Sequence, residues 1–166
     1  TIENFGVEGD LPVRGDFDGD GRNDIAVFRP SNSSWYLRTS GNWGYSVIQF
    51  GQAGDVPIPT DLDGDGKDDI AVFRPGTGEW FRLGTAQPSF NVTQFGAAGD
   101  VPLRGDFDGD GANDIAVFRP SNGNWYLRSP VSGFRIIQFG VSGDVPVPGD
   151  YDNDNKADIA VFRPSN

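Results

Sequence analysis

A nine-residue segment rich in aspartate limits the fold more than any other feature of this sequence. It reads DFDGDGRND in its first copy and DYDNDNKAD in its last, and it holds almost no side chain that could pack into a core. The four copies begin at Asp16, Asp61, Asp106 and Asp150, so they are spaced 45, 45 and 44 residues apart. Recurrence at a period of this length predicts a protein built from structural repeats.

Each repeat contains four short β-like stretches. In the unit that starts at Asp100 they read DVPLRGD, DIAVFRP, NWYLRS and RIIQFG, and no stretch has sustained helical periodicity. The chain has 24 glycines and 12 prolines, which suits many tight turns. The continuous apolar run in DIAVFRP indicates a strand covered on both faces. Four strands in about 45 residues predict the blade of a β-propeller, with a long β-sandwich as the alternative.

We therefore predict an all-β fold, a propeller-like array of four-stranded antiparallel blades with about four repeats of 44–45 residues. Residues 1–166 are expected to form a single repeat domain. Phe5 and Gly6 align with Phe139 and Gly140 of the fourth stretch, whereas the last repeat stops after its second stretch, so one blade is expected to be incomplete. The chain is then a piece of a longer array or a subunit whose open blade edge is completed by another chain. The expected units are 1–9 (partial), 10–54, 55–99, 100–143 and 144–166 (partial).

The aspartates of each loop occupy its first, third, fifth and ninth positions, which would turn several oxygens toward one centre. Hard oxygen ligands in a flexible loop suit Ca²⁺ best, and Mg²⁺ less well because it needs a stricter octahedron. The seventh residue varies, which predicts a ligand through its backbone carbonyl. The alternative is a solvated turn without metal. The predicted carboxylate ligands are Asp16, Asp18, Asp20, Asp24, Asp61, Asp63, Asp65, Asp69, Asp106, Asp108, Asp110, Asp114, Asp150, Asp152, Asp154 and Asp158, and the carbonyl ligands are those of Arg22, Lys67, Ala112 and Lys156.

The fourth and sixth loop positions support this geometry. They are glycine in the first three loops but Asn153 and Asn155 in the last, and both residue types tolerate a left-handed backbone. An EF-hand is excluded because its twelfth position needs a bidentate Glu, whereas this chain has valine there, as at Val27. Four Ca²⁺ ions would change the formal net charge from −11 to −3.

The segment FGVSGDVPVPGDYDNDNKADIAVFRP and its sister segments resemble the FG-GAP/VCBS-type repeats of extracellular propeller proteins, which are related to the blades of integrin α-subunit propellers. The resemblance covers essentially the whole chain, and the aspartate loop is its most specific part. It implies a β-propeller, about four bound Ca²⁺ ions held by the aspartates above, and an extracellular or cell-surface location. The chain departs from integrin-like blades in having FRP where they have GAP.

Other residues recur once per repeat. Arg29, Arg74, Arg119 and Arg163 are expected to pair with Asp10, Asp55, Asp100 and Asp144, although a binding surface is the alternative. Trp35, Trp80 and Trp125 are expected to pack between blades rather than stack on sugars. Trp43 and Tyr45 lie on a variable turn and are better ligand or partner candidates. Asn32 and Asn91 lie in glycosylation sequons.

Composition excludes several functions. A net charge of −11 argues against a nucleic-acid partner, and no apolar run is long enough to span a membrane. The absence of Cys and His removes several nucleophile–base pairs. The clustered aspartates are equivalent in every repeat and form no singular site, so we predict no enzyme activity. We predict a non-catalytic, extracellular, calcium-stabilised protein with an adhesive or structural role, which self-associates into rings or filaments or contacts a glycan or surface protein. The alternatives are a carbohydrate-binding, lectin-like propeller and a fragment of a larger secreted protein.

Overall fold

The computed structural model describes residues 5–85 and 89–164, which form fourteen β-strands and no helix. Neighbouring strands in each sheet are consecutive in sequence and antiparallel. The first sheet comprises β1 (Leu11–Val13), β2 (Ile25–Arg29), β3 (Ser34–Arg38) and β4 (Tyr45–Gln49); the second, β5 (Val56–Pro57), β6 (Ile70–Arg74), β7 (Glu79–Leu83) and β8 (Phe90–Gln94); the third, β9 (Val101–Leu103), β10 (Ile115–Arg119), β11 (Asn124–Ser129) and β12 (Gly133–Gln138); and the fourth, β13 (Val145–Pro146) and β14 (Val161–Phe162).

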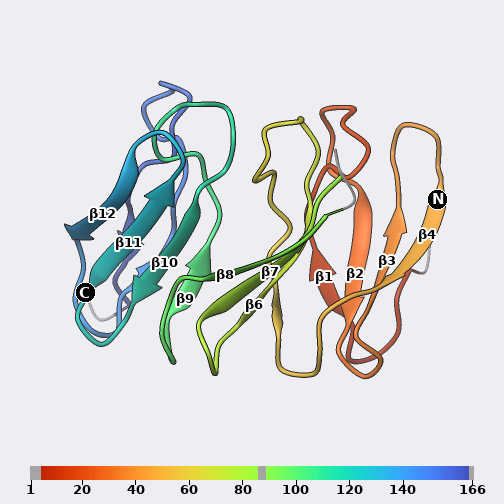
Figure 1. Cartoon of the computed structure of the whole chain (residues 1–166), viewed down its shortest axis with the longest axis horizontal. Coiled ribbons are helices and arrows are strands. Elements are labelled where there is room, and N and C mark those ends of the chain that lie inside the picture. Colours follow the sequence, from red (N-terminus) through yellow and green to blue (C-terminus); the bar gives the residue numbers. More distant parts are fainter. Residues whose placement is uncertain (1–4, 86–88, 165–166) are drawn as a thin grey trace.

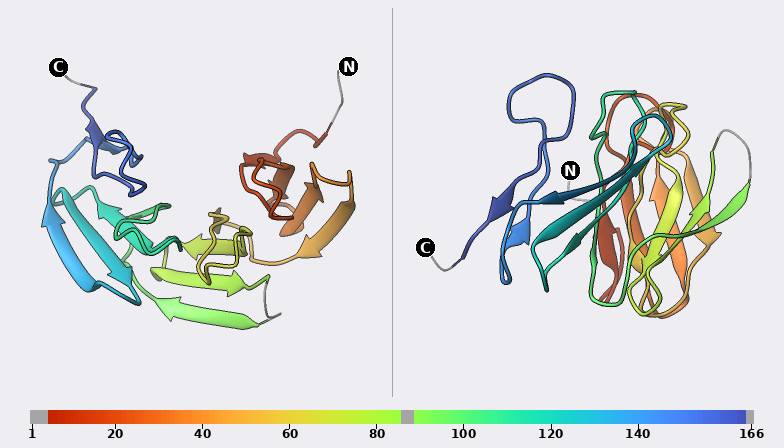
Figure 2. Two further views of the ribbon diagram at one scale, coloured as in Figure 1. Left: turned by 90° about the horizontal axis from the view of Figure 1, so that it is seen from above. Right: turned by 60° about the vertical axis from the view of Figure 1, so that its left-hand side comes forward.

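The sheets stand side by side along the chain (Figure 1). Seen from above, they follow an arc that is open between the first and fourth sheets, with the first strand of each sheet on the inner side (Figure 2). This arrangement confirms the predicted all-β, propeller-like array, including the incomplete last blade. No helix in the described part of the chain is long and apolar enough to cross a membrane.

The innermost strands are shorter than the sequence suggested. DVPLRGD was expected to form one strand, but β9 covers only three of its residues and β5 and β13 only two each. Each of these strands contains a proline, which has no N–H to donate and is tolerated at a sheet edge. Phe5 aligns with Phe139, which follows the end of β12, so the strand expected at the start of the chain falls on residues 1–4, outside the described residues.

The core lies between successive sheets. Phe28 and Trp35 of the first sheet pack against Ile70 and Val72 of the second. Phe73 and Trp80 pack in the same way against Val117 of the third sheet. Phe118 and Trp125 pack against Val161 of the fourth sheet and against Ile159, which precedes it. The central strand of a middle sheet is therefore covered on both faces, as its continuous apolar run predicts.

The repeated tryptophans are packing residues, as expected. Trp35, Trp80 and Trp125 are buried, and each indole N–H donates to the backbone carbonyl of Phe50, Phe95 or Phe139 at 3.2, 2.9 and 2.8 Å. A buried indole needs such an acceptor to balance its lost hydration. Their rings are therefore not available to stack on a sugar.

The predicted Asp–Arg pairs are confirmed, and all four join the start of the first strand of a sheet to the end of the second. Each arginine Nε donates to one carboxylate oxygen and Nη2 to the other, the bidentate geometry that guanidinium favours. The Nε contacts are Arg29–Asp10 at 2.7 Å, Arg74–Asp55 at 2.9 Å, Arg119–Asp100 at 2.7 Å and Arg163–Asp144 at 2.7 Å.

These pairs make folding sensitive to acid. The hydrogen bond from Arg163 holds the pKa of Asp144 to about 2, and the one from Arg29 lowers the pKa of Asp10. In the unfolded chain these carboxyls regain a pKa of about 4, so below that pH the unfolded state binds more protons. We expect the unfolding free energy, measured by urea titration in EGTA, to fall as the pH drops from about 4 to about 2. In Asp144→Asn the unfolding free energy should fall less over this pH range. A pH dependence equal to that of the unmodified chain would contradict the assignment of the acid sensitivity to the Asp–Arg pairs.

Candidate metal sites and an adjoining cavity

The four aspartate loops lie on the same rim of the array, at the top of Figure 1. Each connects the first two strands of its sheet, so the repeat places all four in equivalent positions. In every loop the first, third and ninth residues offer carboxylate oxygens that lie within 4.8 Å of one another. The four triads are Asp16, Asp18 and Asp24; Asp61, Asp63 and Asp69; Asp106, Asp108 and Asp114; and Asp150, Asp152 and Asp158.

Backbone hydrogen bonds hold the triads in place. In the first loop, Asp16 accepts from the N–H groups of Gly19 and Gly21, each at 2.7 Å. Asp24 accepts from the N–H of Phe17 at 2.7 Å. The other three loops repeat all three contacts. A turn of this kind converges carboxylates on one point because its N–H groups face inward.

The exchange of glycine for asparagine preserves the backbone, as predicted. Gly19 and Gly21 have φ of 78° and 82°, and Asn153 and Asn155 both have φ of 66°. These angles lie in the left-handed region, where asparagine is the side-chain-bearing residue best tolerated.

Gly21 offers a direct test of this backbone requirement. A Cβ added there would meet no atom within 4 Å, so only its φ of +82° opposes a side chain. We expect Gly21→Val to lower the unfolding free energy by about 1–2 kcal/mol and Gly21→Asn to cost clearly less. Urea unfolding of both variants measures the difference, and equal losses would contradict the assignment.

The carboxylate at the fifth loop position lies outside the triad and accepts hydrogen bonds from other groups. Asp20 accepts from the backbone N–H of Arg22 at 2.9 Å and from the hydroxyl of Ser40 at 2.8 Å. Asp65 likewise accepts from Lys67 and Thr85, and the N–H groups of Ala112 and Lys156 donate to Asp110 and Asp154. The structure therefore brings together three of the four carboxylates predicted in each loop. The role of the fifth carboxylate and of the seventh carbonyl as ligands stays a prediction.

Like charge is concentrated in these loops. The pKa of Asp114 is raised to about 6, mainly by burial and also by the neighbouring carboxylates of Asp108, Asp106 and Asp110, against the opposing hydrogen bond from Phe107. Burial likewise raises the pKa of Asp63. A cation bound to such a triad would relieve this repulsion, so the donor set fits a hard divalent ion.

Backbone hydrogen bonds connect successive loops across the sheets. The eighth residue of one loop donates its N–H to the carbonyl of the first residue in the preceding loop. The distances are 2.6 Å for Asp68 to Asp16, 2.7 Å for Asn113 to Asp61 and 2.6 Å for Ala157 to Asp106. The acceptor is itself a triad residue, and the donor directly precedes the ninth residue, which belongs to the next triad. These hydrogen bonds therefore link the geometry of one triad to that of the next.

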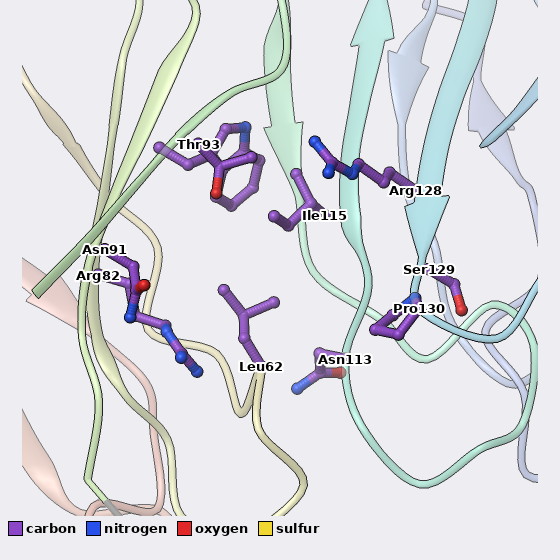
Figure 3. A pocket seen from close by; sticks show the side chains of 10 residues that line it. Leu62, Arg82, Asn91, Thr93, Asn113, Ile115, Arg128, Ser129 and Pro130 are labelled. Carbon is purple, nitrogen blue, oxygen red and sulfur yellow. The ribbon is translucent and has the colours of Figure 1, made fainter. Parts of the chain in front are cut away.

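A cavity of about 520 Å³ opens beside the second loop, between the second and third sheets (Figure 3). Arg82 extends from one wall and Arg128 from the other. Arg82 also contacts the second triad, at 3.3 Å from Asp63 and 3.1 Å from Asp69. The remaining lining residues are Leu62, Trp80, Asn91, Thr93, Asn113, Ile115, Ser129 and Pro130.

The sequence profile of the FG-GAP-like repeat matches residues 16–72 and 106–161, which together make up more than half of the chain. The chain belongs to the FG-GAP-like repeat family. Both matched segments begin at the first aspartate of a loop and end in the strand that pairs with the innermost strand. No curated protein matches the sequence.

A solved structure with a similar fold is that of an Agrocybe aegerita lectin that specifically recognises non-reducing terminal N-acetylglucosamine. The TM-score is 0.64 at 20% sequence identity, and the match covers 95% of this chain and 47% of the lectin. The FG-GAP-like chain thus spans about half the length of that lectin, and the similarity is one of fold.

Two features of these FG-GAP-like repeats were missed in the sequence. Ser40, Thr85 and Ser129 direct hydroxyls at loop carboxylates, on Asp20, Asp65 and Asp108 respectively. A Ser or Thr at the end of the third stretch or within two residues after it, in every complete repeat, was the signal that could have revealed them. The cavity was missed because its two arginines come from different repeats, and only the packing of the sheets brings them together.

Proposed function

We propose that this chain is a non-catalytic, calcium-stabilised extracellular repeat module with a structural or adhesive role. The observation that carries the proposal is the presence of four equivalent carboxylate triads on one rim of the array. Their aspartates recur in every repeat and are engaged by the turn backbone, as expected of structural groups. An enzyme would instead need a singular catalytic group, and the triads provide none.

Calcium is the cation that best suits these loops. Each offers several carboxylate oxygens in a flexible turn, and Ca²⁺ accepts six to eight oxygen ligands with variable geometry. The first, third and ninth aspartates would hold the ion, joined by the fifth carboxylate and the seventh carbonyl. The bound ion supplies positive charge that offsets the repulsion within the triad.

The loops favour a structural role because they link the sheets. An ion that holds the carboxylate of Asp61 in place would also hold the backbone carbonyl of Asp61, which accepts a hydrogen bond from the N–H of Asn113 in the next loop. Ions along the rim would thus stiffen the angle between successive sheets. FG-GAP-like repeats are typical of extracellular proteins, which supports that location for this chain, and extracellular calcium modules work at dissociation constants of about 10⁻⁴–10⁻³ M.

We further propose that a second copy of this chain covers the two end faces of the arc. Ile25 on the first sheet is 41% exposed, whereas its equivalent Ile70 is 4% exposed because the first sheet covers it. Phe162 on the fourth sheet is 59% exposed, whereas its equivalent Phe118 is fully buried. Each end therefore presents one half of the interface that is repeated inside the chain. Contact between unlike ends generates a ring or a filament.

Light scattering after size-exclusion chromatography tests this association. In calcium we expect particles larger than one chain, and Ile25→Asp should dissociate them. Val131→Asp is the matched control, because Val131 is an exposed valine on the β11–β12 turn, away from both ends. A strictly monomeric particle in calcium would count against self-association.

Carbohydrate binding is a second candidate function, favoured by the cavity between the second and third sheets. Its lining mixes arginine, amide and hydroxyl groups with apolar side chains, as small-ligand sites do. The similarity of fold to a lectin adds support. Exposed Trp43 and Tyr45 are an alternative contact surface. Binding on a glycan array tests the candidate; an array without signal would favour the structural role alone.

A further inference from the structure

The cavity exists because the second sheet departs from the repeat at its interface with the third. Strand pairing defines the equivalent positions: Leu37, Arg82 and Leu127 each lie opposite the alanine of the neighbouring strand. Ile48, Thr93 and Ile137 each lie opposite the buried tryptophan. The second sheet therefore has arginine and threonine where its neighbours have leucine and isoleucine.

The third sheet, which forms the opposite wall of the cavity, also differs from the equivalent wall at the interface of the first and second sheets. Between the first and second sheets, Leu37 and Ile48 pack with Ile70 and Leu83 to form an apolar cluster. Arg128 of the third sheet is the equivalent of Leu83, since the two are opposite Ile115 and Ile70. The second interface thus replaces apolar contacts on both walls with polar groups.

A smaller side chain near the rim widens this space. Leu62 follows the first aspartate of the second loop, whereas Phe17 and Phe107 take that place in the first and third loops. Those two rings pack edge-on against Trp35 and Trp125, with centroids 6.4 and 6.3 Å apart. Leucine is shorter than phenylalanine, so the space beside Trp80 is filled less completely.

Positive charge then becomes concentrated in one place on an acidic chain. The cavity lining contains two arginines and no acidic residue, although the net charge of the chain is −11. The charge of Arg82 is paired with the carboxylates of Asp63 and Asp69 in the second loop. The guanidinium of Arg128 has no hydrogen-bond or ion-pair partner within residues 5–85 and 89–164. Guanidinium groups in such a setting favour a planar carboxylate, which they bind with two parallel hydrogen bonds.

We propose that this cavity binds a sugar that carries a carboxylate, such as a uronic acid, with Arg128 as its principal anion contact. The proposal rests on carbohydrate binding as the second candidate function. The amides of Asn91 and Asn113 and the hydroxyl of Thr93 suit the hydroxyl groups of a pyranose, while Leu62 and Ile115 suit its C–H faces. A volume of about 520 Å³ lies in the usual range for small-molecule sites.

Calorimetric titration of the calcium-loaded chain tests the proposal, with glucuronate, glucose and inorganic phosphate as separate probes. Glucuronate should bind at least about tenfold more tightly than glucose, which has the same ring without the carboxylate. Arg128→Leu, which installs the residue that the second sheet has at this position, should weaken glucuronate binding about tenfold or more. Arg38→Leu changes the equivalent arginine of the first sheet and should leave binding unchanged.

The outcomes separate this proposal from the function on which it rests. Equal binding of glucose and glucuronate, unaffected by Arg128→Leu, overturns the acidic-sugar site but leaves carbohydrate binding intact. Phosphate binding as tight as that of glucuronate overturns the sugar class. Absence of binding to either sugar here and to every glycan on the array overturns both. Folding of Arg128→Leu is checked by its melting temperature, because the arginine is exposed and its loss should not unfold the chain.

Discussion

Removing calcium with EGTA is expected to lower the melting temperature by about 10 °C or more. A site occupied at one hundred times its dissociation constant stabilises the folded state by about 2.7 kcal/mol. Each kcal/mol shifts the melting temperature of a domain of this size by about 2–4 °C. Two such sites already give the expected shift, and the structure has four carboxylate triads. Differential scanning calorimetry in calcium and in EGTA measures it.

The control for this experiment is magnesium. Mg²⁺ prefers six ligands in a near-ideal octahedron and keeps several waters, so it should restore less of the lost stability than Ca²⁺. A melting temperature that is the same in EGTA and in calcium would show that the loops are solvated turns without a structural ion.

Trp125→Ala is expected to destabilise the protein by about 3–5 kcal/mol. The ring of Trp125 is fully buried, packs on Phe107 and Phe118, and has its N–H bonded to the carbonyl of Phe139. Its removal leaves a cavity and an unpaired carbonyl. Urea unfolding in saturating calcium gives the loss of free energy.

Trp43→Ala is the matched control for this core substitution. Trp43 is 61% exposed, and its ring contacts the guanidinium of Arg38. Its removal should cost less than about 1 kcal/mol. Similar losses for the two variants would contradict the division between packing and surface tryptophans.

The repeated part of the structure could be predicted from sequence because residues that recur at the same position in every repeat reveal which side chains the fold requires. Four copies of one loop predicted a cluster of four carboxylates, of which the structure brings three together, and the Gly-to-Asn exchange at Asn153 and Asn155 predicted the left-handed turn. An aspartate like Asp10 and an arginine like Arg29 recur in every repeat, which predicted an ion pair between them. The continuous apolar run that precedes the arginine predicted a strand covered on both faces. All of these are local patterns of charge, backbone freedom and apolar side chains.

What could not be predicted depends on contacts between repeats. The N–H of Asn113 reaches the carbonyl of Asp61 only because adjacent sheets pack side by side. The aligned repeats have Leu37 and Leu127 in the place of Arg82, but only the structure shows that these leucines are buried. The short innermost strands were also missed, because the local sequence does not show how far a proline-containing edge strand stays paired with its neighbour.

Equilibrium binding of Ca²⁺ to the metal-free chain tests the central claim most directly. Isothermal titration calorimetry should give a stoichiometry near four ions per chain, one for each triad, and Asp106→Asn combined with Asp114→Asn should remove one of them. The absence of binding up to about 10 mM Ca²⁺, well above the range of extracellular calcium modules, would contradict the account.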